Sequence, residues 1–396
     1  MNQLQTLKGF RDFLPEEKRK RDWVIAKIKQ AFELYGFEPL ETPTLEYASL
    51  LLGKYGAEAD KLVYQFKDRG DRDIALRYDQ TVPTARVLAQ NQNPEQLPKI
   101  MRRYQIQNVF RADKPQKGRF REFTQCDADI FVSNHPLSDA ELLAVFYESY
   151  KQLNLTSLVI KINDRRTLLE TLKPFETDTV SIFSIVQSVD KLDKQTVDEV
   201  TDELVAKGLQ RQSAQKALSE IQNAKASEAL QTIMEYAKKL GVPESALQFT
   251  PTLARGLDYY TGMIFEGIIP QYTAGSIGGG GRYDNLIKDL SGVHVAAAGF
   301  AIGFDRTVEA VGELNLFPET ILSPSSKVLV CVMDETVDQS IQLVRKLRSQ
   351  KIAGELFGTP AKLDKQLKYA SVKKIPFVVI LGPDEVKNET VTVKNM

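Results

Sequence analysis

Residues 253–266 read LARGLDYYTGMIFE, and this stretch is the strongest indicator of fold in the chain. Arg255, Asp258, Tyr259 and Tyr260 interrupt a segment that is otherwise apolar. A strand buried on both faces is nearly all apolar, so these polar side chains indicate contact with a ligand. Arginine stays charged at working pH and binds phosphate or carboxylate with its planar fork. The alternative is an internal ion pair between Arg255 and Asp258 beneath two half-buried tyrosines.

Composition limits the classes of protein to which the chain can belong. It has 396 residues, a formal net charge of zero and a pI near 6.8, so any nucleic-acid surface must be local. Cys126 and Cys331 are far apart, and His135 and His294 show no metal-ligand spacing, so no disulfide scaffold or protein-held metal is expected. The sequence has neither a signal peptide nor an apolar run of about 18 residues. We therefore expect a cytoplasmic protein without a membrane segment.

Hydrophobic periodicity predicts an α+β chain built from several parts. Residues 15–35 have helical spacing, and residues 63–77 alternate like a hairpin. Residues 101–131 are predicted to form strand, loop and strand, and Pro43 predicts an edge strand or a strand end. A polar, Ala- and Glu-rich stretch predicts a helical insertion, and strands alternating with helices near the end predict an α/β domain with a largely parallel sheet. The predicted boundaries are a core at 1–163 and 248–315, the insertion at 164–247, a linker at 316–326 and the terminal domain at 327–396.

The stretch 98–122, PKIMRRYQIQNVFRADKPQKGRFRE, is strongly basic, with only Asp113 and Glu122 as acids. Such a hairpin could bind phosphates along its arms and a polyanion at its tip. The alternative is a solvated basic hairpin with no specific partner. Arg111 follows apolar Val109 and Phe110, and a partly buried arginine needs an anionic partner, which favours the functional interpretation.

Three further stretches combine small and polar residues. In GSIGGGGRYDNL (275–286), four successive glycines leave space for a ligand or another backbone, or else form a flexible turn. In AAAGFAIGFDRTVEA (296–310), Arg306 falls at a helix start, where a cation is unfavourable unless it faces an anion. In ALRYDQTVPTAR (75–86), Asp79 and Thr81 either hold an ammonium group or cap the next helix. The sequence offers three such arginines, Arg111, Arg255 and Arg306, and no catalytic triad. This combination suits phosphate chemistry, in which the protein positions the substrate and neutralises its charge.

These motifs resemble those of the class II aminoacyl-tRNA synthetases, and among them the histidine-specific members. The two histidine signatures are resembled by LARGLDYYTGMIFE and GGGGRYDNL. The first class motif is resembled by YGFEPLETPTLE, the second by FRADKPQKGRFREFTQCDADI and the third by GFAIGFDR. The resemblance covers the chain from LKGFRDFLP near the N-terminus to its end. It implies activation of L-histidine by ATP to histidyl-adenylate and pyrophosphate, followed by transfer to the 3′ end of the histidine tRNA.

The resemblance also implies roles for individual residues. Arg111 is expected at the α-phosphate and Arg306 at the γ-phosphate, with Arg255 neutralising the developing charge. The remaining implied ATP contacts are Arg119 and Glu122. The implied histidine contacts are Asp79 and Thr81 for the ammonium, Gln125 for the carboxylate, Asp129 and Tyr260 for the imidazole, and Tyr259, Gly278, Gly279, Gly280 and Gly281 as walls. The implied contacts to the tRNA acceptor end are Lys114, Gln116, Lys117 and Arg119.

At the level of architecture, the resemblance implies a mostly antiparallel sheet flanked by helices, a homodimer, and a terminal domain that reads the anticodon and is shortened at its end. Magnesium is expected only through the phosphates of ATP. Two alternatives remain open at this point, a non-aminoacylating paralogue such as the regulatory subunit of ATP phosphoribosyltransferase, and a tRNA-sensing module. The intact RGLDYYTG string and the three arginines favour the enzyme over both.

Overall fold

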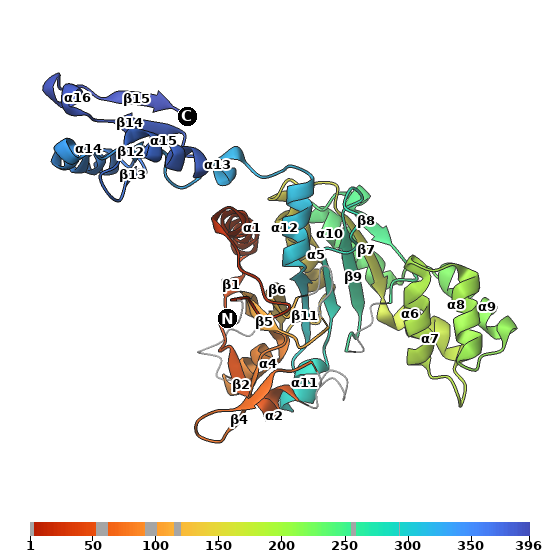
Figure 1. Cartoon of the computed structure of the whole chain (residues 1–396). Helices are drawn as coiled ribbons and strands as arrows, with labels where there is room; N and C mark the ends of the chain where they lie inside the picture. Colours follow the sequence, from red (N-terminus) through yellow and green to blue (C-terminus); the bar gives the residue numbers. More distant parts are fainter. Residues whose placement is uncertain (1–3, 53–61, 92–100, 115–119, 255–258, 293) are drawn as a thin grey trace. The chain divides into compact units, whose positions relative to one another are not determined.

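The computed structural model describes residues 4–52, 62–91, 101–114, 120–254, 259–292 and 294–396. It contains two compact units, one formed by residues 1–12 and 24–316 and the other by residues 13–23 and 317–396 (Figure 1). Residues 13–23, which include the start of the first helix at Pro15, therefore group with the terminal part of the chain. The domain boundaries expected from the sequence remain a prediction.

The first unit is built on an eight-stranded sheet whose order is β1-β5-β6-β11-β10-β9-β7-β8. Neighbouring strands are antiparallel except for the parallel pairs β1–β5 and β7–β8 at the two edges. In that order, the strands are β1 (Glu38–Pro39), β5 (Met101–Phe110), β6 (Glu122–Phe131), β11 (Ala297–Ile302), β10 (Gly278–Arg282), β9 (Met263–Ile268), β7 (Val159–Asp164) and β8 (Leu247–Phe249). The predicted mostly antiparallel sheet is confirmed, and β1, which ends before Pro43, lies at one edge of it.

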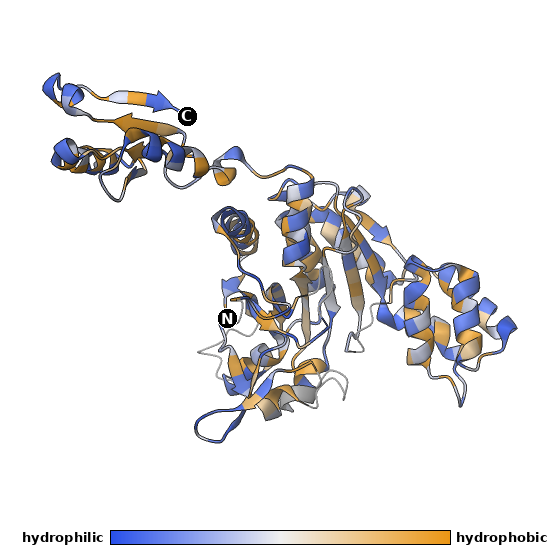
Figure 2. Cartoon of the chain, viewed as in Figure 1, coloured by the Kyte–Doolittle hydropathy of each residue, from blue (hydrophilic) through white to orange (hydrophobic). Residues whose placement is uncertain are grey.

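A small sheet of three antiparallel strands accompanies the large one, with the order β2-β4-β3. The strands are β2 (Leu45–Tyr47), β4 (Asp73–Leu76) and β3 (Gln65–Lys67). The turn between β3 and β4 contains Asp71 at φ 59°, and it is among the hydrophilic segments of the chain (Figure 2). The hairpin expected at residues 63–77 is thus present.

One face of the large sheet packs against helices through a cluster of aromatic side chains. Phe146 contacts Phe265 and Phe300 edge to face, with ring centroids 5.1 Å apart in both pairs, and Phe300 also contacts Phe32. Such edge-to-face arrangements add to the free energy of apolar burial. Outside the insertion, the described helices are α1 (Pro15–Leu34), whose part from residue 24 onward belongs to this unit, α2 (Ala48–Leu51), α4 (Thr81–Gln90), α5 (Pro136–Lys151), α11 (Leu286–Ser291) and α12 (Phe304–Glu313).

The predicted helical insertion begins directly after β7. Its helices are α6 (Arg165–Leu172), α7 (Ile182–Val189), α8 (Val197–Ala206), α9 (Arg211–Gln222) and α10 (Glu228–Lys239). The first four share one apolar cluster, whereas α10 packs against α5. The Thr196 side chain and Glu199 form a capping box at the start of α8, which satisfies backbone N–H groups at that end. The compact bundle is therefore α6 to α9.

The second unit contains a four-stranded sheet of order β13-β12-β14-β15, in which only the β14–β15 pair is antiparallel. Its elements are α13 (Glu319–Leu322), β12 (Val328–Val330), α14 (Val337–Ser349), β13 (Gly354–Leu356), α15 (Leu363–Val372), β14 (Phe377–Ile380), α16 (Pro383–Lys387) and β15 (Thr392–Asn395). The apolar β14 stands out in Figure 2. The predicted α/β domain with a largely parallel sheet is confirmed.

Among the described residues, no helix has the length and apolar character needed to cross a bilayer.

Candidate active site

The second face of the large sheet carries a buried polar layer where β5 pairs with β6. Alternate residues of a strand point to the same face, and the register sets Arg103 opposite Asp129, Gln105 opposite Asp127 and Gln107 opposite Gln125. Gln80, which precedes α4, lies across both strands because its Nε2 donates to the backbone oxygens of Gln107 at 3.0 Å and Gln125 at 3.1 Å. The polar layer therefore comprises Gln80, Arg103, Gln105, Gln107, Gln125, Asp127 and Asp129.

The charged centre of this layer is an ion pair between Arg103 and Asp129. Arg103 is 1% exposed, and its Nη2 lies 2.7 Å from Oδ2 of Asp129. The other carboxylate oxygen accepts a hydrogen bond from the Tyr283 hydroxyl. Burial raises the pKa of Asp129, and the adjacent Arg103 guanidinium opposes that rise.

Asp127 lies two residues before Asp129 on the same face, and among the described residues no cation forms an ion pair with it. Its Oδ2 accepts a hydrogen bond from Gln125 Nε2 at 2.9 Å. Burial raises the pKa of the Asp127 carboxyl to about 8, because desolvation disfavours the charged form. Among the described residues, Arg103 thus forms an ion pair with Asp129, whereas it opposes the rise in the Asp127 pKa without such a pair.

Small residues on β10 and β11 continue this face beside the two acids. Gly299 pairs with Asp129 and Ala301 with Asp127 in the register of β11 and β6. A Cβ atom on Gly299 would lie 1.9 Å from Oδ1 of Asp129, so only glycine leaves room for that carboxylate. A Cβ atom on Gly280 would lie 2.0 Å from the Gly299 carbonyl oxygen, so this glycine is required by a neighbouring backbone.

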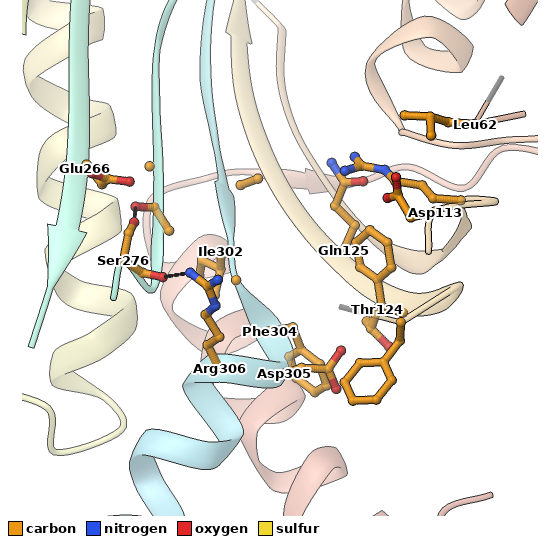
Figure 3. Close-up of a pocket in the computed structure, with 17 residues that line it drawn as sticks. Leu62, Asp113, Thr124, Gln125, Glu266, Ser276, Ile302, Phe304, Asp305 and Arg306 are labelled. Atoms are coloured by element: carbon orange, nitrogen blue, oxygen red, sulfur yellow. Dashed lines mark hydrogen bonds between the residues drawn. The ribbon is translucent and has the colours of Figure 1, made fainter. Parts of the chain in front are cut away.

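A cleft of about 650 Å³ opens along the continuation of this face. Arg111 and Arg306 both line it, as do Gln125, Gly278 and Gly279 (Figure 3). Arg306 extends from α12 and donates from Nη1 to the Ser276 carbonyl oxygen at 2.7 Å. Arg111 donates from Nε to the Tyr78 carbonyl oxygen at 3.0 Å, and its guanidinium lies 5.1 Å from the centroid of the Phe123 ring. Backbone contacts therefore fix both guanidinium groups while part of each faces the cleft.

The tyrosines of the histidine signatures form a cluster next to Asp129. Tyr259 and Tyr260 have ring centroids 4.6 Å apart, and Tyr259 contacts Tyr283 edge to face at 6.0 Å. Tyr260 and Tyr283 are buried. Aromatic walls of this kind, with a carboxylate at the end, can enclose a small polar ring.

The other expected site residues differ in how they are placed. Asp79 is 8% exposed, and its Oδ1 accepts a hydrogen bond from the Val82 N–H at 3.1 Å, so the capping contact is present. Thr81 is the first residue of α4. Glu122, the first residue of β6, accepts a hydrogen bond from the Asn108 side chain. Lys114 is exposed beside the hairpin tip. Arg255, Asp258, Gln116, Lys117 and Arg119 lie outside the described residues.

The sequence alone assigned no role to three residues of this face, Arg103, Asp127 and Tyr283. The pattern that could have indicated the first two is the alternation of polar and apolar residues along β5 and β6. Polar residues alternate with Tyr104 and Ile106 on one strand, and with Cys126, Ala128 and Ile130 on the next. Because the two strands pair, this double alternation predicts one polar and one apolar face of the sheet.

No group of three or more His, Cys, Asp or Glu side chains is arranged to hold a metal ion in the part of the chain that the structure describes.

Comparison with known proteins identifies the family. The family described as "Histidyl-tRNA synthetase" matches residues 9–307, and the family described as "Anticodon binding domain" matches residues 327–396.

Curated relatives named histidine–tRNA ligase include one from Cytophaga hutchinsonii, 38% identical over 98% of this chain and 94% of its own length. A second, from Gloeobacter violaceus, is 38% identical over 97% of this chain and 93% of its own length. A solved structure of histidyl-tRNA synthetase from a Nostoc species, 28% identical, superposes with a TM-score of 0.82 and covers 99% of this chain and 94% of that one. The chain therefore belongs to the histidyl-tRNA synthetase family of class II aminoacyl-tRNA synthetases.

Proposed function

We propose that this chain activates L-histidine with ATP and then transfers the histidyl group to the 3′ end of the histidine tRNA. The observation that carries the proposal is one continuous sheet face. Two guanidinium groups line a cleft at one end of it, and a carboxylate enclosed by tyrosines lies at the other. A nucleotide triphosphate suits the first end, and an imidazole suits the second.

The phosphate end neutralises charge without a protein-held metal. When the histidine carboxylate attacks the α-phosphorus, negative charge grows on the phosphate oxygens and on the leaving pyrophosphate. Arg111 is proposed to contact the α-phosphate and Arg306 the γ-phosphate, with Arg255 assisting at the α-phosphate. Donors that are already fixed, as Arg111 and Arg306 are, stabilise this charge without reorganising during the reaction. Magnesium is proposed to accompany ATP through its phosphates, with Arg119 and Glu122 as further nucleotide contacts.

The histidine end selects the imidazole by an acceptor and by aromatic walls. Asp129 is proposed to accept a hydrogen bond from the ring, with Tyr260 and Tyr283 beside it and Tyr259 and the glycines of β10 as walls. Asp79, Thr81 and Gln125 are proposed to hold the ammonium and carboxylate groups. A side chain without a ring N–H donor would leave Asp129 without that partner, which disfavours its binding.

Four further proposals follow from membership of the family. The hairpin tip with Lys114, Gln116, Lys117 and Arg119 contacts the acceptor end of the tRNA, and residues 327–396 read the anticodon. The chain acts as a homodimer, which sedimentation of the purified protein would test. It acts in the cytoplasm.

Histidine-dependent exchange of pyrophosphate into ATP tests the proposed activity directly. We expect exchange with histidine, and none above background with the other standard amino acids. Absence of exchange with histidine would contradict the activity and would favour a non-aminoacylating paralogue or a tRNA-sensing module. Charging of full-length histidine tRNA then tests the second step.

The Gly299→Ala substitution should selectively damage the histidine end of the site. The new Cβ meets Asp129 Oδ1, and overpacking of this kind costs ~1–3 kcal/mol while displacing the carboxylate from Arg103 and Tyr283. We expect the KM for histidine in pyrophosphate exchange to rise at least ~10-fold, equivalent to ~1.4 kcal/mol of lost binding.

Gly358→Ala is the matched control, because a Cβ there meets no atom within 4 Å. Its histidine KM and melting temperature should stay at the wild-type values. A Gly299→Ala variant with wild-type histidine KM would show that the position of Asp129 does not govern histidine binding.

A further inference from the structure

The N-terminal stretch LKGFRDFLP, at residues 7–15, belongs to the family resemblance but has no task in the mechanism described so far. Its backbone turns at Gly9, whose φ of 92° lies in the left-handed region that favours glycine. Phe10 closes this turn, because its N–H donates to the Leu7 carbonyl at 3.0 Å. The turn therefore sets the direction of the chain just before Arg11.

The same segment is attached to the base of the basic hairpin that β5 and β6 form. The Arg121 N–H donates to the Gly9 carbonyl at 2.9 Å, and the Arg121 carbonyl accepts from the Arg111 N–H at 2.9 Å. The Nε of Arg121 donates to the Asp113 carbonyl at 3.0 Å, and Asp113 lines the cleft. Two backbone hydrogen bonds through Arg121 thus connect the N-terminal segment with Arg111, the proposed α-phosphate contact.

The Arg11 side chain contacts two residues that line the cleft, Phe120 and Asp305. Its Nη2 donates to Oδ1 of Asp305 at 3.0 Å, and its guanidinium carbon lies 3.2 Å from the centroid of the Phe120 ring. A planar guanidinium can lie over an aromatic face while its N–H groups pair with a carboxylate. Phe120 directly precedes the start of β6, and Asp305 belongs to α12, so one side chain joins two separate walls of the cleft.

Carboxyl groups on the walls of this cleft bear on the binding of a polyanion. The described residues that line it include two cations, Arg111 and Arg306, and three acids, Asp113, Glu266 and Asp305. Asp305 immediately precedes Arg306, the proposed γ-phosphate contact, so its charge acts at the phosphate end of the cleft (Figure 3). A negative charge there weakens the binding of a triphosphate, and the guanidinium of Arg11 offsets that charge.

The presence of an acid at this position has a local cause. Asp305 lies in the first turn of α12, where a carboxylate interacts favourably with the helix dipole. The helix that carries Arg306 is therefore stabilised by a charge that disfavours the nucleotide. Pairing with Arg11 keeps the stabilisation of the helix and removes the repulsion of the phosphates. The two side chains of the pair are 26% and 18% exposed, so water screens their charges only in part.

We propose that Arg11 is a positioning residue for ATP, because it neutralises Asp305 on the wall of the cleft and holds Asp305 and Phe120 in place. The inference rests on the proposed function, since it assumes that the cleft takes ATP. Arg11 acts on the substrate through these two side chains and not on the reacting atoms. Its loss should therefore raise the KM for ATP much more than it lowers kcat.

Histidine-dependent pyrophosphate exchange by the full chain, with ATP varied at low salt and at about 0.5 M KCl, tests the inference. Arg11→Met keeps an apolar contact with the Phe120 ring and removes the charge. At low salt we expect its KM for ATP to rise at least ~10-fold, with kcat within about threefold and the histidine KM within about twofold of wild type. Because salt screens partly exposed charges, the ratio of variant to wild-type KM should fall to ~3 or less at high salt. Arg11→Lys keeps the charge, so its KM for ATP should stay within about threefold of wild type at both salt concentrations.

An Asp305→Asn background separates charge from packing. In that background Arg11→Met should change the KM for ATP by less than about threefold, because the carboxylate that Arg11 neutralises is gone. Arg211→Met is the matched control, since it removes the cation of an exposed arginine–aspartate pair, with Asp202, in the insertion. Its melting temperature and both KM values should equal those of the wild type.

A KM for ATP in Arg11→Met within about twofold of wild type at low salt would overturn the inference. So would a rise that persists both at high salt and in the Asp305→Asn background, because Arg11 would then act by packing alone. An Arg11→Lys protein with its KM for ATP raised ~10-fold would overturn it as well, whether or not Arg11→Met folds. In each of these cases, histidine-dependent exchange by the wild type shows that the proposed function stands and that only the role of Arg11 is wrong. Absence of exchange in the wild type overturns both.

Discussion

Replacement of Arg111 by alanine should lower the rate of histidine-dependent ATP–pyrophosphate exchange by ~100- to 1000-fold, the range observed when one fixed donor to a developing oxyanion is removed. Arg111 follows the last residue of β5, and its Nε is held by the Tyr78 carbonyl at 3.0 Å. The guanidinium is therefore oriented toward the cleft before ATP binds. Such a group stabilises the charge that grows during attack on the α-phosphate more than it stabilises bound ATP. We expect kcat to fall far more than the KM for ATP rises.

Arg102→Ala is the appropriate control, because Arg102 lies on β5, the strand that leads to Arg111, and its side chain points to the opposite face. There its Nη2 pairs with Glu141 of α5 at 2.6 Å. This variant should exchange pyrophosphate within about threefold of wild type, since a partly exposed pair contributes ~1 kcal/mol or less. If Arg111→Ala instead raised the KM for ATP and left kcat unchanged, Arg111 would act as a uniform nucleotide contact. The proposed role at the α-phosphate would then be wrong.

Much of the fold could be predicted because its signals are local. The hairpin of β5 and β6 alternates over ten residues in each strand, and α4 and α12 begin where the sequence predicts helices. Other features depend on contacts between distant segments. Residues 13–23 join the terminal unit, where Trp23 packs edge to face against Phe317 at 5.5 Å. Similarly, α10 leaves the insertion bundle to pack against α5. Periodicity within a helix does not specify which partner covers its apolar face.

In the site, too, some residues could be predicted from the local sequence, whereas others depend on tertiary contacts. Arg111 and Arg306 could be proposed from sequence because a cation beside apolar residues or at a helix start needs an anion, and both line the same cleft. Arg103 could not be separated from the other cations of the basic hairpin by composition alone. Its role depends on Asp129, which stands opposite in the register of β5 and β6 and pairs with it. Asp127 was missed for a related reason, since nothing in the local sequence shows that this carboxyl will be buried on the polar face of the sheet.

Replacement of Arg103 by methionine should destabilise the protein by ~3–5 kcal/mol at pH 8, the cost of leaving one charge of a buried pair uncompensated. Both side chains of the pair are almost fully buried, at 1% and 6% exposure, so water cannot solvate Asp129 in place of the guanidinium. Urea unfolding followed by circular dichroism measures the change. Arg102→Met, which breaks the partly exposed pair with Glu141, should cost ~1 kcal/mol or less in the same assay.

The pH dependence and a double substitution separate charge from packing in this prediction. Burial already raises the pKa of Asp129, and removal of Arg103 raises it further, so the carboxyl can protonate in the folded variant. An acid with a raised folded-state pKa loses stability as pH rises above its unfolded value. The deficit of Arg103→Met should therefore be small near pH 5 and large at pH 8. Adding Asp129→Asn removes the uncompensated charge, so the double variant should recover most of the stability at pH 8, whereas its histidine-dependent exchange should stay low because the proposed acceptor for the imidazole is gone. A deficit that is the same at both pH values, or that Asp129→Asn does not relieve, would assign the effect to packing and would remove the electrostatic basis proposed for this end of the site.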